Sequence, residues 1–287
     1  TLRAMGKTVH PANYSFMDFR LAEVLGETES VVDELLMSVN GKLRRDFLYY
    51  PEGYLTHWFL ETRDEDVPVW MLAKRGIQAI KTAYEALIKH LGGIDAIILI
   101  DGGVDSLMRG DEMGAGTLLE DSITIGAIEQ LYIPVKIIAS LGFGTEVEEA
   151  VCHYLALENM SALIKDGGFY GTCALTPQME AFQLYESACR FAWERSESHH
   201  KSHISTRVIP AVHGEFGNYD MYNELKGMTV FISPLMSIYW FFDVNKVAER
   251  NLLIPEIRDT LTFEDALQIT MHHRLNLTPR PRRSIPY

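Results

Sequence analysis

The sequence predicts an α/β fold: a mostly parallel sheet with helices on both faces and an elaborated C-terminal half. Two short, β-branched and almost wholly apolar runs, residues 94–100 and 135–140, are typical of strands covered on both faces of a parallel sheet. Helix-spaced apolar residues separate these runs, and a repeated strand–helix order favours parallel pairing. Because 287 residues with 47% apolar composition allow one large core, we expect a single domain over residues 1–287.

The other elements follow in order along the chain. Residues 1–7 resemble the last turn of a helix, with Gly6 as its C′ residue, and lead into a strand at 8–12. Because the chain opens inside a helix, we expect that an upstream strand and loop have been lost, with a frayed but natural N-terminus as the alternative. The remaining periodicities predict strands at 67–72, 206–212 and 229–232, helices at 74–91, 118–131, 146–164 and 177–196, and mostly helical structure over 243–273.

Composition excludes several functional classes. Lys and Arg number 26 against 39 Asp and Glu, and the net charge of −13 argues against nucleic-acid binding, which needs a basic face. Three cysteines without CxxC spacing indicate neither a disulfide framework nor a zinc site, and favour the cytoplasm. The longest apolar run, 228–242, is shorter than the ~20 residues of a membrane-spanning helix, so we expect core strand and no membrane partner. The expected partner is a small molecule, with a homo-oligomer as a further alternative.

A glycine-rich turn follows each of the two apolar strands. The first, 101–117, has five glycines and ends in Thr117-Leu-Leu-Glu120, the spacing of a capping box at a helix start. The second follows residue 140 and repeats the pattern in Thr145 to Glu148. Helix starts favour anions, and the carboxyl ends of parallel strands line ligand crevices, although the glycines could serve only tight turns. The residues expected to bind a phosphate-containing ligand are Gly102, Gly103, Ser106, Gly116, Thr117, Gly142, Gly144 and Thr145.

Acidic residues concentrate in the first turn. Four carboxylates within twelve residues could hold Mg²⁺ against a phosphate, or hydrogen-bond ribose or amine groups. We expect Asp101, Asp105 and Asp111 as metal ligands, and Asp101, Asp105 and Glu112 as catalytic groups. His213 and Glu215, on a glycine-containing turn after the expected strand 206–212, are candidates for acid–base work, with a structural turn as the alternative.

The string IILIDGGVDSLMRGDEMGAGTLLEDSITIGAI, residues 97–128, resembles the signature of the DUF1152 family, a domain of unknown function. Further matches lie at 49–55, 67–78, 139–146, 214–217 and 239–251. The resemblance implies an α/β protein with a Rossmann-like core whose members begin with a strand and a run of glycines followed by Asp. That opening is absent here, and the family supplies no established activity.

Three functional hypotheses follow. The leading one is an enzyme, a hydrolase or group transferase, that binds a nucleotide or other phosphorylated metabolite between the two turns with Mg²⁺. The second is a non-catalytic metabolite-binding or assembly protein. The third is an adenylating enzyme, because Asp101 to Ser106 is similar to the phosphate loop of ATP-pyrophosphatases; those loops open with Ser, and a carboxylate at Asp101 repels phosphate unless a metal intervenes.

Overall fold

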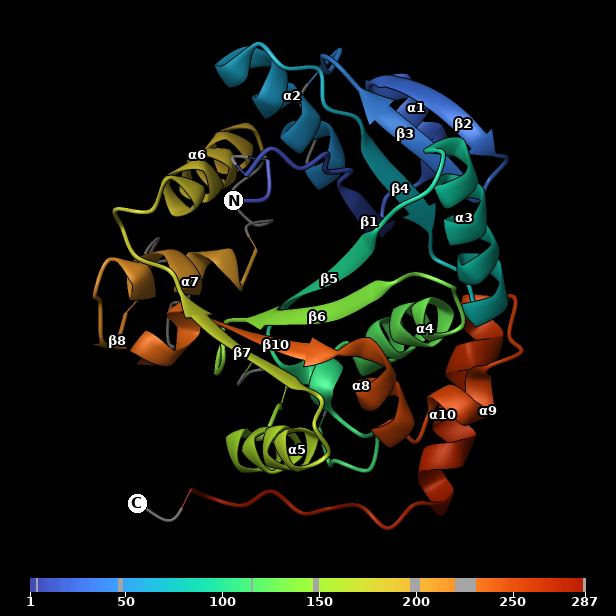
Figure 1. Cartoon of the computed structure of the whole chain (residues 1–287), viewed down its shortest axis with the longest axis vertical. Coiled ribbons are helices and arrows are strands. Elements are labelled where there is room, and N and C mark those ends of the chain that lie inside the picture. Colours follow the sequence, from blue (N-terminus) through green and yellow to red (C-terminus); the bar gives the residue numbers. More distant parts are fainter. Residues whose placement is uncertain are drawn as a thin grey trace. The chain divides into compact units, whose positions relative to one another are not determined.

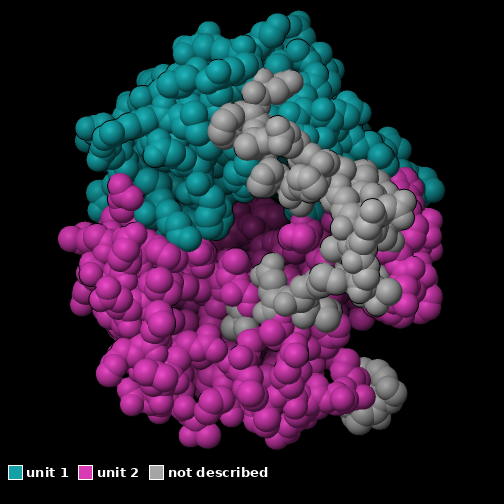
Figure 2. Space-filling model, turned by 180° about the vertical axis from the view of Figure 1, so that it is seen from behind, with its two compact units in different colours: residues 1–74, 82–92, 177–202 teal, residues 75–81, 93–176, 203–287 magenta. Residues whose placement is uncertain are grey.

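The computed structural model describes residues 1–3, 5–45, 49–114, 116–146, 150–196, 202–219 and 231–285. It confirms the α/β class (Figure 1). Contacts divide the chain into two compact units: unit 1 comprises residues 1–74, 82–92 and 177–202, and unit 2 comprises residues 75–81, 93–176 and 203–287 (Figure 2). The single domain expected over 1–287 stays a prediction.

Unit 1 is built on a four-stranded sheet in the order β1-β4-β3-β2. β1 runs parallel to β4, whereas β3 is antiparallel to both β4 and β2. Helix α2 begins at Pro51, whose missing N–H suits the first turn of a helix, and packs on β3 and β4. The elements are β1 (Ala12–Ser15), α1 (Phe19–Leu25), β2 (Glu27–Val32), β3 (Leu36–Asn40), α2 (Pro51–Arg63), β4 (Val69–Ala73) and α6 (Glu180–Arg195), and the residues of α3 (Ile77–His90) are divided between the two units.

Unit 2 contains the second four-stranded sheet, in the order β5-β6-β10-β7. β5 and β6 are parallel and are connected by α4, while β10 lies between β6 and β7 and is antiparallel to both. The strands are β5 (Ala96–Gly102), β6 (Val135–Leu141), β7 (Phe169–Ala174) and β10 (Ile238–Asp243), with a small pair of β8 (Gly217–Asn218) and β9 (Phe231–Ile232). The helices are η1 (Asp105–Leu107), α4 (Leu118–Glu129), α5 (His153–Lys165), α7 (Ser205–Val212), η2 (Pro234–Ser237), α8 (Val244–Arg250), α9 (Ile254–Ile257) and α10 (Phe263–Asn276).

Both four-stranded sheets are mixed rather than mostly parallel. Within the described residues the parallel pairs are β1–β4 and β5–β6. The apolar run 228–242 does contain strand, but residues 228–230 lie outside the described part, and β10 returns antiparallel to its neighbours. An apolar run predicts burial and extension, and it carries no information on strand direction. β5 is also not covered on both faces, because Ile100 keeps 64% of its surface exposed.

Several expected elements have other boundaries or another type. The expected strand 206–212 is helix α7, because a continuous apolar run fits a buried helix as well as a buried strand. The expected helix 146–164 begins only at His153, and the strand expected at 8–12 lies at Ala12–Ser15. The first residues confirm a helix-ending turn: Gly6 N–H donates to Arg3 O and Lys7 N–H to Leu2 O, the two bonds of a Schellman motif.

In the part of the chain that the structure describes, no helix is both long enough and apolar enough to cross a bilayer.

Candidate functional site

The two glycine-rich turns leave the same edge of the unit 2 sheet. In the parallel pair β5–β6, Asp101 stands opposite Ser140 and Gly102 opposite Leu141. Beyond the strands, Val104 N–H donates to Glu146 Oε2 over 2.7 Å, which joins the turns directly. The parallel pairing therefore brings together two segments that are about forty residues apart in the sequence.

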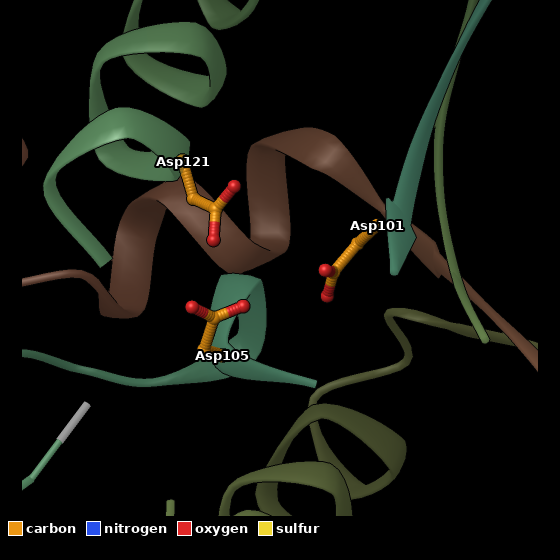
Figure 3. A group of neighbouring side chains, drawn as sticks. All are labelled: Asp101, Asp105 and Asp121. Atoms are coloured by element: carbon orange, nitrogen blue, oxygen red, sulfur yellow. The ribbon is translucent and has the colours of Figure 1, made fainter. Parts of the chain in front are cut away.

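Three aspartates converge at this edge, each from a different element. Asp101 lies at the end of β5, Asp105 begins η1, and Asp121 lies in the first turn of α4. One carboxylate oxygen from each lies within 4.8 Å of the others, and Figure 3 shows the three side chains directed toward one another. Oδ2 of Asp121 is buried and has no hydrogen-bond partner among the described residues. A buried, unpaired carboxylate oxygen is costly unless a cation or a proton compensates it.

Hydroxyl and amide donors orient two of the three carboxylates. Ser106 Oγ donates to Asp101 Oδ2 over 2.5 Å. Thr117 donates to Asp105 Oδ2 twice, from its backbone N–H over 2.5 Å and from its hydroxyl over 2.9 Å. The first glycine-rich turn thus folds back so that Thr117 binds Asp105. The remaining lone pairs of the Asp101 and Asp105 carboxylates are left for other partners.

A fourth carboxyl, that of Glu146, packs against the cluster. A Cβ atom at Gly103 would overlap the Glu146 carboxyl group, and one at Gly116 would overlap Asp105 Oδ2. Both glycines also have positive φ, +147° at Gly103 and +52° at Gly116. These positions require glycine because the backbone approaches a carboxylate more closely than any side chain permits.

Burial and mutual repulsion raise the pKa of the cluster. Burial, followed by the charge of Asp105, raises the pKa of Asp101 to about 7 and that of Glu146 to about 11. The same two causes raise the pKa of Asp121 well above its ordinary value. Without a cation the site therefore retains protons near neutral pH, and a divalent cation would have to displace them.

Asp111 and Glu112, which sequence reasoning placed with the metal and catalytic groups, lie in a different cluster. Both pair with Arg280, Asp111 over 2.9 Å and Glu112 over 2.5 Å. Burial acts to raise the pKa of Glu112, but hydrogen bonds from Arg109 N–H, Asn159 and Gly110 N–H outweigh it and lower that pKa. Glu112 is thus held by hydrogen bonds outside the aspartate group, and its expected catalytic role stays a prediction. Asp121 stands in the aspartate group where Asp111 was expected.

The first capping box does not form as the spacing suggests, and the second lies partly outside the described residues. Thr117 is the N-cap of α4, but its side chain makes no capping bond, because the hydroxyl donates to Asp105. Thr145 donates its hydroxyl to Gly142 O over 2.7 Å, and α5 begins only at His153. Glu148 lies outside the described residues. Among the residues described around this turn, the helix start is at His153, and the phosphate-binding role expected of Gly142, Gly144 and Thr145 stays a prediction.

The two residues expected to do acid–base work lie elsewhere in unit 2. His213 and Glu215 are exposed on the turn that follows helix α7 and are not part of the aspartate group. Asp121 and Glu146 were not among the expected site residues. A signal for both was present, since each closely follows a glycine-rich turn, but acids beside a helix start are ordinarily explained by capping.

Among known proteins, a model of a family of proteins of unknown function matches residues 59–276. The matched range contains the three aspartates and Glu146. No curated protein and no solved structure matches the chain. Since the family model covers most of the sequence, the chain belongs to the DUF1152 family of proteins of unknown function.

Proposed function

We propose that Asp101, Asp105 and Asp121 bind a divalent cation, Mg²⁺, and that the protein is an enzyme acting on a nucleotide or other phosphorylated metabolite by hydrolysis or group transfer. One observation carries the proposal: three carboxylates within 4.8 Å, one with a buried, unpaired oxygen. Hard cations prefer carboxylate oxygens, and Mg²⁺ is ordinarily held by a few carboxylates together with substrate phosphates.

The donors already in use indicate how a phosphate would bind. Val104 N–H donates to Glu146 and Thr117 N–H to Asp105, so neither amide is available to an anion. A phosphate next to this cluster would be repelled by the carboxylates that are ionised unless a cation lay between them. We therefore assign the phosphate oxygens to the open coordination positions of the cation rather than to a backbone cradle.

Glu146 supplies a proton-exchanging group in this proposal. Its raised pKa, caused by burial and by Asp105, keeps the carboxyl protonated while the cation is absent. A cation on the aspartates would lower that pKa, so the loaded site would have a carboxylate beside the reacting phosphate that could accept a proton from an attacking water.

Three further observations bear on the adenylating-enzyme hypothesis, the Rossmann-like comparison and the expected location. An adenylating enzyme would use the amides of residues 102–106 to cradle pyrophosphate, and the Val104 amide is occupied. We retain the Rossmann-like comparison only for the β5-α4-β6 segment, which has the parallel strand–helix–strand order. A cytoplasmic location is part of the proposal, since Cys152 and Cys173 are free thiols.

Calorimetric titration with Mn²⁺ and with Mg²⁺ tests the cation site. We expect Asp121→Asn to weaken cation binding at least about tenfold, because it removes a charged ligand. Asp95→Asn is the matched control: Asp95 is exposed and immediately precedes β5, and its loss should leave the affinity unchanged. Absence of cation binding to the wild type, or equal affinities in both variants, would refute the proposed site.

Turnover separates an enzyme from a binding protein. The wild type would be incubated with Mg²⁺ and ATP, ADP or inorganic pyrophosphate, and released phosphate measured, with Asp121→Asn as the inactive reference. Release that depends on Mg²⁺ and on Asp121 supports the enzyme. Tight Mg²⁺-dependent binding of these compounds without turnover supports the non-catalytic metabolite-binding protein instead.

A further inference from the structure

The chain beyond α10 runs extended along unit 2 toward the C-terminus (Figure 1). We call residues 277–285 the C-terminal strap. Arg280 N–H donates to Asp111 O over 2.7 Å, and Arg280 forms an isolated parallel bridge with Glu112. Further along, Cys152 Sγ donates to Arg283 O over 3.4 Å. The strap therefore contacts both the first glycine-rich turn and the start of α5.

The guanidinium group of Arg280 makes most of the hydrogen bonds that attach the C-terminal strap. Arg280 donates from Nε to Asp111 over 2.9 Å, from Nη2 to Glu112 over 2.5 Å and to Asn159 over 3.2 Å, and from Nη1 to Glu158 over 2.5 Å. The Glu112 side chain is completely buried. The planar, five-donor guanidinium meets several acceptors at once, which the single ammonium of lysine could not reproduce.

Glu112 in turn shapes the turn that carries it. Its Oε1 accepts Arg109 N–H over 3.0 Å, and its Oε2 accepts Gly110 N–H over 2.8 Å. Without Arg280, Glu112 would be a buried carboxylate lacking its cation, a state that proteins relieve by rearrangement or protonation. The conformation of residues 109–112 consequently depends on the strap.

The same turn continues directly into the aspartate group. Gly114 packs against Ala150 so closely that a Cβ at Gly114 would overlap the Ala150 side chain. Two residues later Gly116 lies against Asp105, and Thr117 donates both of its hydrogen bonds to the Asp105 carboxylate. A displacement of residues 109–114 would therefore be transmitted to the position of Thr117 and so to Asp105.

We propose that Arg280 is a positioning residue for the cation site, acting from the C-terminal strap through Glu112 and Thr117 on Asp105. The inference rests on the proposed function, since it assumes that Asp105 is a cation ligand. Arg280 lies outside the aspartate group and pairs with acids that are not members of it. Its effect on the cation is thus conveyed by the geometry of the turn.

Mn²⁺ titration of Arg280→Met tests this inference, with Arg282→Met as the matched control. Both variants remove one positive charge from the strap, and Arg282 is exposed. Removal of a positive charge by itself favours cation binding, so electrostatics predicts a slightly tighter affinity in both. The positioning role predicts the opposite sign for Arg280→Met alone, an affinity loss of about tenfold, the size of effect seen when groups supporting metal ligands are removed.

The titration would be run well below the melting temperature of the variant, with near-ultraviolet circular dichroism to show that it is folded. A folded Arg280→Met that melts earlier but binds Mn²⁺ as the wild type does would overturn the inference, since Arg280 would then be structural only. If Arg280→Met does not fold, Arg280→Lys replaces it, with the same two outcomes. A wild type that binds no Mn²⁺ refutes the proposed function itself, which is a separate result.

Discussion

At the scale of single residues, Asp105 is the centre of the candidate site. It accepts two hydrogen bonds from Thr117. Burial first and then the charge of Asp105 raise the pKa of Asp101, Asp121 and Glu146. A group of carboxyls that repel one another in a buried position costs folding free energy whenever they are ionised. Strongly raised pKa values in a cluster of carboxyls are more common at functional sites than in structural ion pairs, and this is why we treat the cluster as a candidate site.

The raised pKa values determine how stability depends on pH in metal-free buffer. In the folded protein Asp101 keeps its proton up to about pH 7, whereas in the unfolded chain it loses the proton near pH 3.8. Glu146 keeps its proton up to about pH 11 in the folded protein and loses it near pH 4.5 in the unfolded chain. Between about pH 5 and about pH 8 the folded state therefore binds more protons, and its stability falls as the pH rises. We expect the melting temperature in EDTA to decrease over this range.

Two comparisons identify the source of that decrease. Asp101→Asn should flatten the profile, because it removes a carboxyl that ionises in this window. Saturating Mg²⁺ should raise the melting temperature more at about pH 8 than at about pH 5, because fewer protons have to be displaced. A melting temperature that rises steadily with pH in EDTA would contradict the assignment.

At the scale of elements, the glycine-rich turn fits around the carboxylates that it positions. Gly116 has a positive φ and lies against Asp105. Gly167, after α5, also has a positive φ, +74°, but a Cβ atom at that position would meet nothing within 4 Å. Alanine substitutions at Gly116 and Gly167 therefore separate two effects of an added methyl group. Both positions share the backbone strain, whereas only the methyl group at position 116 would contact a carboxylate.

We expect both alanine variants to lose stability and only one to lose the cation. Gly116→Ala and Gly167→Ala should each be destabilised by about 1 kcal/mol from the left-handed backbone alone. Gly116→Ala should in addition displace Asp105 and weaken Mn²⁺ binding, measured by titration of the folded proteins. Equal cation affinities in the two variants would show that the close approach at Gly116 does not shape the site.

Prediction from sequence succeeded where one local signal was sufficient. The apolar runs 94–100 and 135–140 are strands, and their parallel register brings the two turns together at one sheet edge. Prediction failed where contacts between residues far apart in the sequence determine the structure. The sequence pattern favoured Asp111 over Asp121 as a ligand. The path of the turn reverses this order, since Arg280, far along the chain, pairs with Asp111. The run 206–212 is largely buried, so its periodicity could not distinguish helix from strand.

At the scale of the whole molecule, cooperativity tests the expected single domain. One domain over 1–287 predicts one thermal transition with equal calorimetric and van't Hoff enthalpies. Differential scanning calorimetry of the metal-free protein measures both. Two separate transitions would contradict the prediction and would match the division of the chain into units 1 and 2 (Figure 2).

The place of β10 in the second sheet has a consequence for how the protein is made. In the described sheet β7 is hydrogen-bonded to β10. β10 also pairs with the edge of β6 that faces away from β5. Because β10 is translated well after β7, the emerging polypeptide exposes the unpaired backbone of β6 and β7 until that late segment leaves the ribosome. We therefore expect nascent chains to have two unpaired strand edges that can pair with other chains until residues 238–243 arrive.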